Sequence, residues 1–322
     1  MARTLITGGA GYIGLALVDE LLEAGRDVTV LDVLLHNQAQ LASELETKGV
    51  RFVEGDIRDP DKRAQALQGA DEVVHLAAIV GDPACARDPE LAQQVNVEAS
   101  KALAQEATEI GHFVMASTCS NYGRMTDPTV PIDETGTLAP VSLYAEQKVA
   151  VEQHLLANTD APYAVTCLRF ATVYGVAPRM RFDLTVNEFT RDLWADRRLE
   201  VFGEQFWRPY VHVRDAARGI RTILEAPKDQ TRGQVFNVGD SDENYRKLDL
   251  VEQIRRQTDK GEVAFVSRQE DPRDYKVSFD KIRATLGYEV TMTVPTGISE
   301  LLESLDAGRF PDAFDGRYRN IP

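Results

Sequence analysis

Apolar and polar residues alternate along the first half of the chain in blocks that predict strands separated by helices. Short segments rich in apolar and β-branched residues predict strands at residues 5–6, 28–31, 51–54, 72–76 and 113–116. Apolar residues at helical spacing predict helices at residues 13–21, 101–110 and 144–156. This alternation implies β-α-β crossovers, and therefore an α/β fold with a doubly wound parallel sheet that has helices on both faces.

The turn between the first strand and the first helix is rich in glycine. It reads Thr7-Gly8-Gly9-Ala10-Gly11-Tyr12-Ile13-Gly14. Glycines at these positions allow a tight turn, close approach of the backbone to a pyrophosphate, and close packing of helix on strand. The helix then directs its free N–H groups at the phosphates. We therefore predict a dinucleotide-binding loop, with contacts from Gly8, Gly11, Tyr12, Ile13 and Gly14.

Asp32 indicates which dinucleotide binds. It ends the second predicted strand, roughly 20 residues beyond the glycine turn. A carboxylate at this place can hold both ribose hydroxyls and would repel a 2′-phosphate. Arg26 and His36 are the nearby basic residues in the sequence, and neither directly follows Asp32. The predicted cofactor is NAD rather than NADP.

Ligands of such sheets bind beyond the carboxyl ends of the strands, so we inspected the residues at the next strand ends. Asp56 follows the third strand and can accept a hydrogen bond from an adenine amino group, while Ile57 packs on the ring. The small residues of Leu76-Ala77-Ala78 let the backbone approach the cofactor. His75, just before them, is interpreted as a packed histidine rather than a catalytic one.

Tyr144 and Lys148 are four residues apart on a predicted helix, so they share one face of it. A cation beside a phenol favours the phenolate and lowers a pKa that is otherwise about 10. A tyrosine in this setting can exchange a proton with an alcohol near neutral pH. Thr118, at the end of the fifth predicted strand, can donate a second hydrogen bond to the same oxygen. The predicted catalytic residues are Thr118, Tyr144 and Lys148.

Composition narrows the class of protein. At 322 residues the chain can form one large domain or two unequal ones, and its net charge of −15 argues against a nucleic-acid partner. A few arginines in one cleft can still bind a phosphorylated small molecule. Cys85, Cys119 and Cys167 are far apart, which favours a reducing compartment without disulfides or a zinc site. Without a signal core or an apolar span, we expect a cytoplasmic protein with no membrane partner and no bound metal.

Together these motifs resemble those of the extended short-chain dehydrogenase/reductases, and within them the nucleotide-sugar epimerases and dehydratases typified by UDP-glucose 4-epimerase. The resemblance covers most of the chain and rests on residues 8–14, 55–58, 75–78, 117–118, 144 with 148, and 168–175. It implies a Rossmann-type NAD-binding domain over residues 1–170, to which a later segment of about 205–240 returns. It also implies a smaller carboxyl-terminal α/β domain, mainly residues 171–322, that binds a nucleotide-diphosphate sugar.

The resemblance assigns roles around the cofactor. It implies that Tyr144 is the acid/base at a sugar hydroxyl, that Thr118 aligns this hydroxyl, and that Lys148 also binds the nicotinamide ribose. Ser117 belongs to the same strand end and is expected at the cofactor. Asn96 matches an asparagine that lies near the cofactor in relatives, and its alternative role is a helix N-cap.

The resemblance also implies contacts with the substrate diphosphate. Residues 179–182 (Arg-Met-Arg-Phe, which includes Arg181) and Asn187 fall where a substrate loop and its diphosphate contact are expected. Arg208 and Arg273 match arginines that clamp the diphosphate, whose charge and geometry suit bidentate guanidinium groups.

The expected sugar pocket departs from the common pattern. Residues 79–87, including Val80, do not look like the usual loop of UDP-glucose epimerases, and Ala171 stands where many relatives have a substrate-binding asparagine. Cys119 and Ser120, also expected at the substrate, replace the Asp-Glu pair of 4,6-dehydratases. An atypical sugar is therefore plausible, and no evident carboxylate follows Thr118 to expel a hydroxyl from C6.

Four functions were weighed. The leading one is an NAD-dependent epimerase, in which Tyr144 removes a hydroxyl proton, hydride passes to NAD, and hydride returns to the other face of the keto-sugar. The alternatives are a keto-sugar reductase or dehydrogenase, and a dehydratase in which Cys119 or Glu146 replaces the missing acid. A catalytically silent dinucleotide sensor is disfavoured, because Thr118, Tyr144 and Lys148 are all present.

Assembly rests on analogy. Relatives commonly dimerise through the helix that carries the tyrosine and the lysine. Here that helix has apolar residues at Val149, Val151, Leu155 and Leu156, so we expect a homodimer. The last dozen residues, rich in Asp, Arg and Pro, are expected to wrap the surface.

Overall fold

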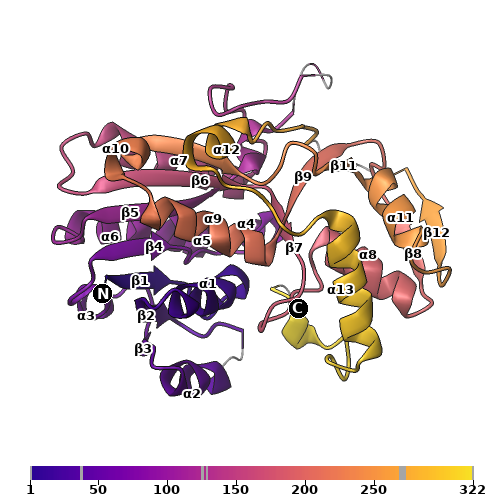
Figure 1. Ribbon diagram of the computed structural model, residues 1–322, viewed down its shortest axis with the longest axis horizontal. Coiled ribbons are helices and arrows are strands. Elements are labelled where there is room, and N and C mark those ends of the chain that lie inside the picture. The colour runs from indigo at the N-terminus through magenta and orange to yellow at the C-terminus, as the bar shows by residue number, and fades with distance from the viewer. Residues whose placement is uncertain (1, 37–38, 125–126, 128–129, 268–272, 321–322) are drawn as a thin grey trace.

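The computed structural model describes residues 2–36, 39–124, 127, 130–267 and 273–320 (Figure 1). Its strands are β1 (Arg3–Thr7), β2 (Asp27–Asp32), β3 (Arg51–Glu54), β4 (Glu72–His75), β5 (His112–Thr118), β6 (Ala164–Phe170), β7 (Thr172–Tyr174), β8 (Arg198–Val201), β9 (Trp207–His212), β10 (Gln234–Val238), β11 (Asn244–Arg246) and β12 (Glu262–Phe265). Its helices are α1 (Tyr12–Glu23), α2 (Ala39–Thr47), α3 (Pro60–Leu67), α4 (Asp82–Arg87), α5 (Pro89–Gln93), α6 (Ser100–Glu106), α7 (Leu143–Ala157), α8 (Thr185–Trp194), α9 (Val213–Glu225), α10 (Lys228–Thr231), α11 (Lys247–Arg255), α12 (Asp280–Leu286) and α13 (Val294–Asp306).

A seven-stranded sheet in the order β10-β6-β5-β4-β1-β2-β3 forms the larger part of the molecule. Every neighbouring pair in it is parallel. The strand order runs outward from β1 in both directions, through β2 on one side and β4 on the other, which creates a crevice beyond their carboxyl ends. The predicted fold class, an α/β fold with a Rossmann-type doubly wound sheet, is confirmed.

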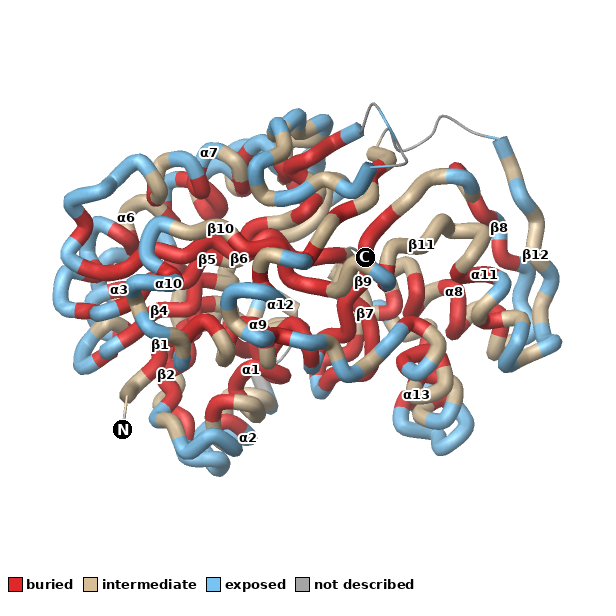
Figure 2. The backbone as a smooth tube through the Cα atoms, turned by 45° about the horizontal axis from the view of Figure 1, so that its top comes forward, coloured by how far each residue is buried: buried red, intermediate tan, exposed pale blue. Residues whose placement is uncertain are grey.

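Alternate residues of the sheet pack against helices on its two faces. Ile6 and Val74 belong to a core with α1, α9 and α12, whereas the neighbouring Leu5 and Val73 belong to a core with α3, α6 and α7. This is the period-two alternation of a strand that is covered on both sides. Figure 2 shows the strands buried in the middle and the outer surfaces of the helices exposed.

The second half of the chain builds a smaller layer beside the carboxyl edge of the sheet (Figure 1). β7, β9 and β11 form a three-stranded sheet, and β8 pairs with β12. These strands share a third core with α8, α11 and α13. Within the segment 205–240, β10 is a strand of the large sheet and α9 packs against that sheet, whereas β9 belongs to the three-stranded sheet.

The helix predicted over residues 101–110 is shorter than expected. α6 ends at Glu106, and the chain then turns so that the backbone N–H of Gly111 donates to the oxygen of Asp71 at 2.8 Å. That bond aligns the chain for entry into β5, while Ile110 stays in the core. Within the described ranges, every helix is too short or too polar to cross a membrane.

Candidate active site

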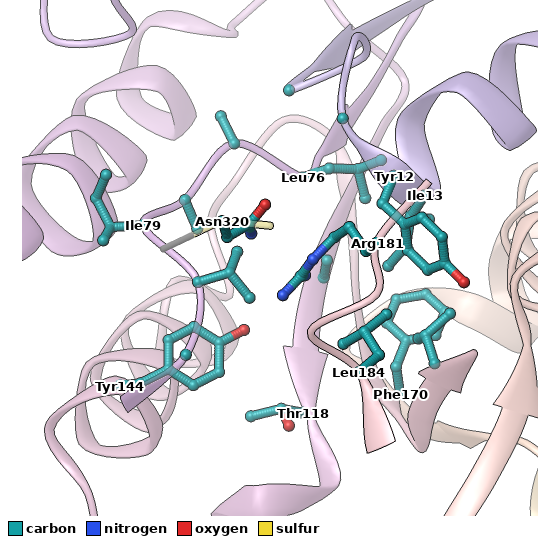
Figure 3. A pocket seen from close by; sticks show the side chains of 18 of the residues that line it. Tyr12, Ile13, Leu76, Ile79, Thr118, Tyr144, Phe170, Arg181, Leu184 and Asn320 are labelled. Atoms are coloured by element: carbon teal, nitrogen blue, oxygen red, sulfur yellow. The ribbon is translucent and has the colours of Figure 1, made fainter. Parts of the chain in front are cut away.

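A cavity of about 790 Å³ follows the carboxyl edge of the seven-stranded sheet. One wall consists of the segments just after the strand ends, such as Gly8 after β1 and Leu76 after β4. The opposite wall is made by segments of the second half that carry Arg181, Arg208 in β9, and Arg273. Figure 3 shows Tyr144 and Thr118 bordering one part of this cavity, with Arg181 extending toward them from the other wall.

The glycine turn forms a cradle made of backbone. Gly8 has a φ of +73°, and a Cβ on it would lie 2.8 Å from the nitrogen of Ala77. A Cβ on Gly14 would lie 2.4 Å from the oxygen of Gly8. α1 begins at Tyr12 without a side-chain cap, so its first N–H groups remain open to an anion. These features fit the pyrophosphate of a dinucleotide.

Asp32 lies beside this cradle at the end of β2. Its carboxylate accepts hydrogen bonds from the backbone N–H groups of Ala10 at 3.0 Å and Leu34 at 2.8 Å. Burial raises the pKa of Asp32, and these hydrogen bonds together with the charge of Arg179 oppose that rise. Arg179 lies in the loop after β7, far from Asp32 in the sequence. The sequence near Asp32 therefore indicated only Arg26 and His36 as its basic neighbours.

Asp56 and His75 occupy the next two strand ends. Both carboxylate oxygens of Asp56 accept from Arg58, at 3.1 and 3.0 Å from its Nε, which lowers the pKa of Asp56. His75 is fully enclosed and hydrogen-bonded to Thr7 and Ser100, each at 2.7 Å. Burial lowers its pKa to about 3, so the imidazole stays neutral, as a packed histidine should.

Tyr144 and Lys148 lie in the first turns of α7, which begins after an N-cap at Ser142. The Nζ of Lys148 donates to the oxygen of Ala116 at 2.9 Å and lies 5.9 Å from the centre of the Tyr144 ring. Thr118 ends β5 and accepts from the N–H of Ser120 at 3.1 Å. The helix and the strand thus bring the three predicted catalytic side chains to the same part of the cavity.

The pKa of Tyr144 differs from the expectation that Lys148 lowers it. Burial raises this pKa above its ordinary value, and the opposing charges are those of Arg181 and Arg273. Burial also lowers the pKa of Lys148 to about 8, so that it begins to lose its charge just above neutral pH. The sequence argument counted the neighbouring cation but not the desolvation of both groups.

Glu152, four residues after Lys148, extends this helix face into a buried network that sequence analysis missed. Its carboxylate accepts from the hydroxyl of Ser117 at 2.7 Å and from the Nε of Arg169 at 3.1 Å. Arg169 in turn donates to the hydroxyl of Tyr122 at 2.9 Å. The network ties α7 to the ends of β5 and β6, directly behind the cavity.

The arginines of the opposite wall are held by partners. Arg273 lies 3.1 Å from the carboxylate of Asp82 and donates to the hydroxyl of Ser120 at 3.4 Å. Arg208 donates to the oxygen of Trp207 at 2.7 Å, and its guanidinium lies 5.1 Å from the Tyr275 ring centre. These contacts hold two cationic groups at the cavity.

Comparison with known proteins identifies the class. The sequence model of the NAD dependent epimerase/dehydratase family matches residues 4–239. The chain belongs to this family. A dTDP-glucose 4,6-dehydratase of Streptomyces niveus is 31% identical over 94% of the chain and 92% of its own length. A UDP-glucose 4-epimerase of Mycolicibacterium smegmatis is 30% identical over 94% of the chain and 97% of its own length.

Solved structures of family members agree with the fold. The UDP-glucuronic acid 4-epimerase of Bacillus cereus, in complex with UDP-glucuronic acid and NAD, has a TM-score of 0.83 at 25% identity and covers 95% of this chain and 99% of its own. The UDP-glucose 4-epimerase of Thermotoga maritima, with UDP-glucose, has a TM-score of 0.83 at 26% identity, with the same coverage of 95% and 99%. NAD is accordingly the cofactor of this family member.

Most of the predicted contacts line the cavity. On the cofactor side these are Gly8, Gly11, Tyr12, Ile13, Gly14, Asp32, Asp56, Ile57, Leu76, Ala77, Ala78, Ser117, Tyr144 and Lys148. On the substrate side they are Val80, Thr118, Ser120, Arg181, Arg208 and Arg273. Ser117 lines the cavity although its hydroxyl points back to Glu152.

Three predicted contacts, Asn96, Cys119 and Asn187, are buried behind the cavity instead of lining it. Asn96 sits inside a π-helical turn (Gln94–Ala99) and not at a helix N-cap, and its amide pairs with both backbone groups of Ile79. Cys119 follows Thr118 in a tight turn that directs its thiol to the oxygen of Arg169 at 3.2 Å.

Asn187 has a structural role in the first turn of α8. Its side-chain oxygen accepts from the N–H of Gly175 at 2.8 Å, and its amide donates to the hydroxyl of Tyr12 at 3.2 Å. It therefore joins the loop after β7 to the start of α1. These bonds leave it enclosed between the two halves of the chain, and it does not line the cavity.

Asp183, Arg319 and Asn320 of the second half also line the cavity, although nothing in the sequence pointed to them, and Arg179 was expected only as part of the substrate loop. Asn320 corrects the expectation that the carboxyl-terminal tail only wraps the surface. The available signal was the Arg-Met-Arg-Phe stretch at residues 179–182, which was assigned to the substrate alone.

Proposed function

We propose that this family member catalyses the NAD-dependent epimerisation of a nucleotide-diphosphate sugar through a transient keto-sugar. The observation that supports it best is the position of Tyr144 and Thr118. They border the same cavity as the backbone cradle at Gly8, and arginines form the opposite wall. A sugar held by its diphosphate on those arginines is thereby presented to a proton-transferring phenol next to the dinucleotide.

The chain would hold NAD along the first wall. The backbone from Gly8 to Gly14 takes the pyrophosphate, Asp32 takes the adenosine ribose hydroxyls, and Lys148 takes the nicotinamide ribose. When bound, NAD supplies a hydride acceptor and donor for one sugar carbon. We assign this role to residues 1–170 with α9 and β10, and sugar binding mainly to residues 171–322.

Tyr144 and Thr118 handle the proton of the reacting hydroxyl. Tyr144 carries its proton at neutral pH, because burial raises its pKa, and so it can donate to the ketone oxygen in the return step. In the forward step it must first become phenolate, which the positive charges of Arg181 and Arg273 favour. The hydroxyl of Thr118 aligns the same oxygen.

Epimerisation is favoured over dehydration because the acids suggested for dehydration are misplaced. Cys119 is buried with a pKa raised well above its usual value, and Glu146 is exposed outside the cavity lining. Two observations nevertheless favour dehydration as a second candidate, ahead of the net oxidoreductase that the sequence alone ranked second. The dehydratase of S. niveus is among the relatives, and Asp82 places a carboxylate in the cavity near Tyr144.

Purified protein incubated with NAD and a panel of UDP-, dTDP-, GDP- and CDP-sugars, uronic acids included, tests the proposal. Chromatography with mass analysis should show a new peak of unchanged mass, without accumulation of NADH. A product lighter by one water would establish dehydration. Accumulating NADH would establish a dehydrogenase, and turnover of keto-sugars only, with NADH consumed, a reductase.

A homodimer in the cytoplasm completes the proposal. Val151 and Leu155 of α7 are in the core, so only the half-buried Val149 and Leu156 are available to a partner. The three cysteines are free and buried, which suits a reducing compartment. Light scattering during size-exclusion chromatography should give twice the chain mass. The mass of a monomer would contradict the proposed homodimer.

A further inference from the structure

The loop between β7 and α8 crosses the cavity from the second half of the chain and carries Arg179. This side chain is only 7% exposed, yet it lines the cavity together with Asp32 and His36. Its charge acts on both of them, and it contributes to lowering the pKa of His36 to about 4, where burial is the main cause. No direct ion pair joins the described side chains of Arg179 and Asp32. They face the same end of the cavity from opposite walls.

Arg179 has hydrogen-bonding capacity that the protein itself does not use. One terminal nitrogen, Nη2, donates to the side-chain oxygen of Asn320 at 2.6 Å. The Nε is buried and has no hydrogen-bond partner among the described residues. Burying an unpaired donor of a charged group is costly, so such groups mark places where a ligand completes the bonding.

The carboxyl-terminal tail holds this loop in place. The N–H of Phe182 donates to the oxygen of Tyr318 at 2.8 Å, and the N–H of Asn320 donates to Asp183 at 3.1 Å. The rings of Phe182, Phe310 and Tyr318 meet edge to face with centres 5.1 to 5.6 Å apart. Residues 179–183 and 318–320 therefore form one unit, the clasp; Figure 3 shows two of its members, Arg181 and Asn320, at the cavity.

We propose that Arg179, positioned by Asn320, is a cofactor-binding residue that closes the adenosine end of the NAD site opposite Asp32. Asp32 accepts hydrogen bonds from the ribose hydroxyls, and the guanidinium donates from the other side to a ribose or phosphate oxygen. The clasp thereby slows the release of NAD, which suits a reaction that returns the cofactor to its starting state. The inference rests on the NAD site of the proposed function but not on the choice of sugar.

Release of NAD tests the proposal without any sugar. Protein purified with its NAD is diluted into an NAD-scavenging enzyme, and the remaining bound NAD is followed with time. Arg179→Met should release NAD about 10- to 100-fold faster, because a charge-assisted hydrogen bond is lost. Arg179→Lys and Asn320→Ala should show smaller increases. Arg317→Ala, at an exposed arginine of the same tail outside the cavity lining, is the matched control and should match the wild type.

Folding of each variant is checked by its melting temperature without NAD. Wild-type release rates in both Arg179→Met and Asn320→Ala would overturn the proposal, and if sugar turnover persisted, the proposed reaction would stand without it. The proposal would also be overturned if the wild type bound NADP more tightly than NAD and Arg179→Met reversed this preference. Arg179 would then bind the 2′-phosphate of NADP. If the variants released NAD faster and the wild type turned over no sugar, the proposed role of the clasp would stand and the proposed reaction would be contradicted.

Discussion

The two walls of the cavity are built in different ways. The first wall is backbone and small side chains, as at Gly8 and Ala77, where added atoms would collide with main chain. The second wall consists of long cationic side chains held by partners, as Arg181 is held by Asp183 at 3.0 and 2.8 Å and Arg273 by Asp82. Close backbone contact tolerates no substitution, whereas side-chain pairs can be exchanged one at a time. The backbone wall therefore suits an invariant cofactor, and the wall of paired side chains suits a variable substrate.

The largest effect should come from breaking the first wall. Gly8→Ala places a methyl group 2.8 Å from the backbone of Ala77, in addition to a strained positive φ, so NAD binding should be lost. Gly25→Ala is the matched control, because Gly25 also has a positive φ, of +72°, but nothing within 4 Å of its Cβ. That variant should lose only about 1 kcal/mol of unfolding free energy and keep its NAD. Calorimetric titration with NAD compares the two; equal losses of binding would contradict the steric argument.

Tyr144→Phe should have the next largest effect. It removes the proton-transferring group and leaves the backbone of the first wall unchanged. Loss of the phenol removes proton transfer, so turnover should fall about 10²- to 10⁴-fold while NAD content is unchanged. Tyr163→Phe is the control, since that hydroxyl is buried and donates to the oxygen of Ala104 away from the cavity. Initial rates with the sugar identified by the panel give the comparison. Similar rates in both variants would remove Tyr144 from the mechanism.

The first wall could be predicted because its residues are neighbours in the sequence or lie at one strand end. Gly8 to Gly14 is a single turn, and Tyr144 and Lys148 are one helical step apart. Even here, spacing could not say which side of the turn each residue faces. Cys119 does not line the cavity, because the 3-10 turn after β5 (Cys119–Tyr122) directs its thiol to the oxygen of Arg169, whereas Thr118 and Ser120 do line it.

The second wall could be predicted only through resemblance, and then incompletely. Arg179 and Asn320 are 141 residues apart, and no local pattern relates them. Arg208 and Arg273 were found because they match family positions, whereas Arg179 lay in a stretch already assigned to substrate. The pKa values also depend on burial, which a sequence does not give, so Lys148 was expected to lower the pKa of Tyr144 when both are instead shifted by desolvation.

Glu152 tests what joins the helix of Tyr144 to the first wall. Glu152→Gln leaves the guanidinium of Arg169 buried without its counter-charge, which should cost about 3–5 kcal/mol of unfolding free energy. Glu289→Gln is the control, because its pair with Arg283 is largely exposed and should contribute below about 1 kcal/mol. Urea unfolding measures both. A loss in Glu152→Gln as small as in the control would show that packing alone positions α7.

Arg273→Lys should separate the two walls. Lysine keeps the charge but not the forked donors that suit a diphosphate, so KM for the nucleotide sugar should rise about 10- to 100-fold. NAD content should not change, because Arg273 belongs to the second wall. Arg283→Lys, at the exposed pair with Glu289, is the matched control and should keep the wild-type KM. A parallel loss of NAD would show that the two walls are not independent.

Lys148 is a buried cation of the first wall, and its pH dependence gives the smallest and most specific test. Its pKa is about 8 in the folded protein and about 10.5 in the unfolded chain, so between these values the unfolded chain holds more protons. Stability from this group therefore rises as pH increases through that window, and below it the buried charge is destabilising in full. Lys148→Met should be more stable than the wild type near pH 7, by an amount on the order of 1–2 kcal/mol, and this gain should shrink toward pH 10.

Urea unfolding at both pH values measures the gain, and initial rates measure activity alongside it. A gain that disappears at high pH, together with lost activity, would mean that a destabilising charge is kept at this position for catalysis. A gain that does not change with pH would show that the pKa of Lys148 is not lowered. Lys148 would then be positioned by packing, like the backbone around it. Packing would hold the first wall throughout, and paired charges would hold the second wall.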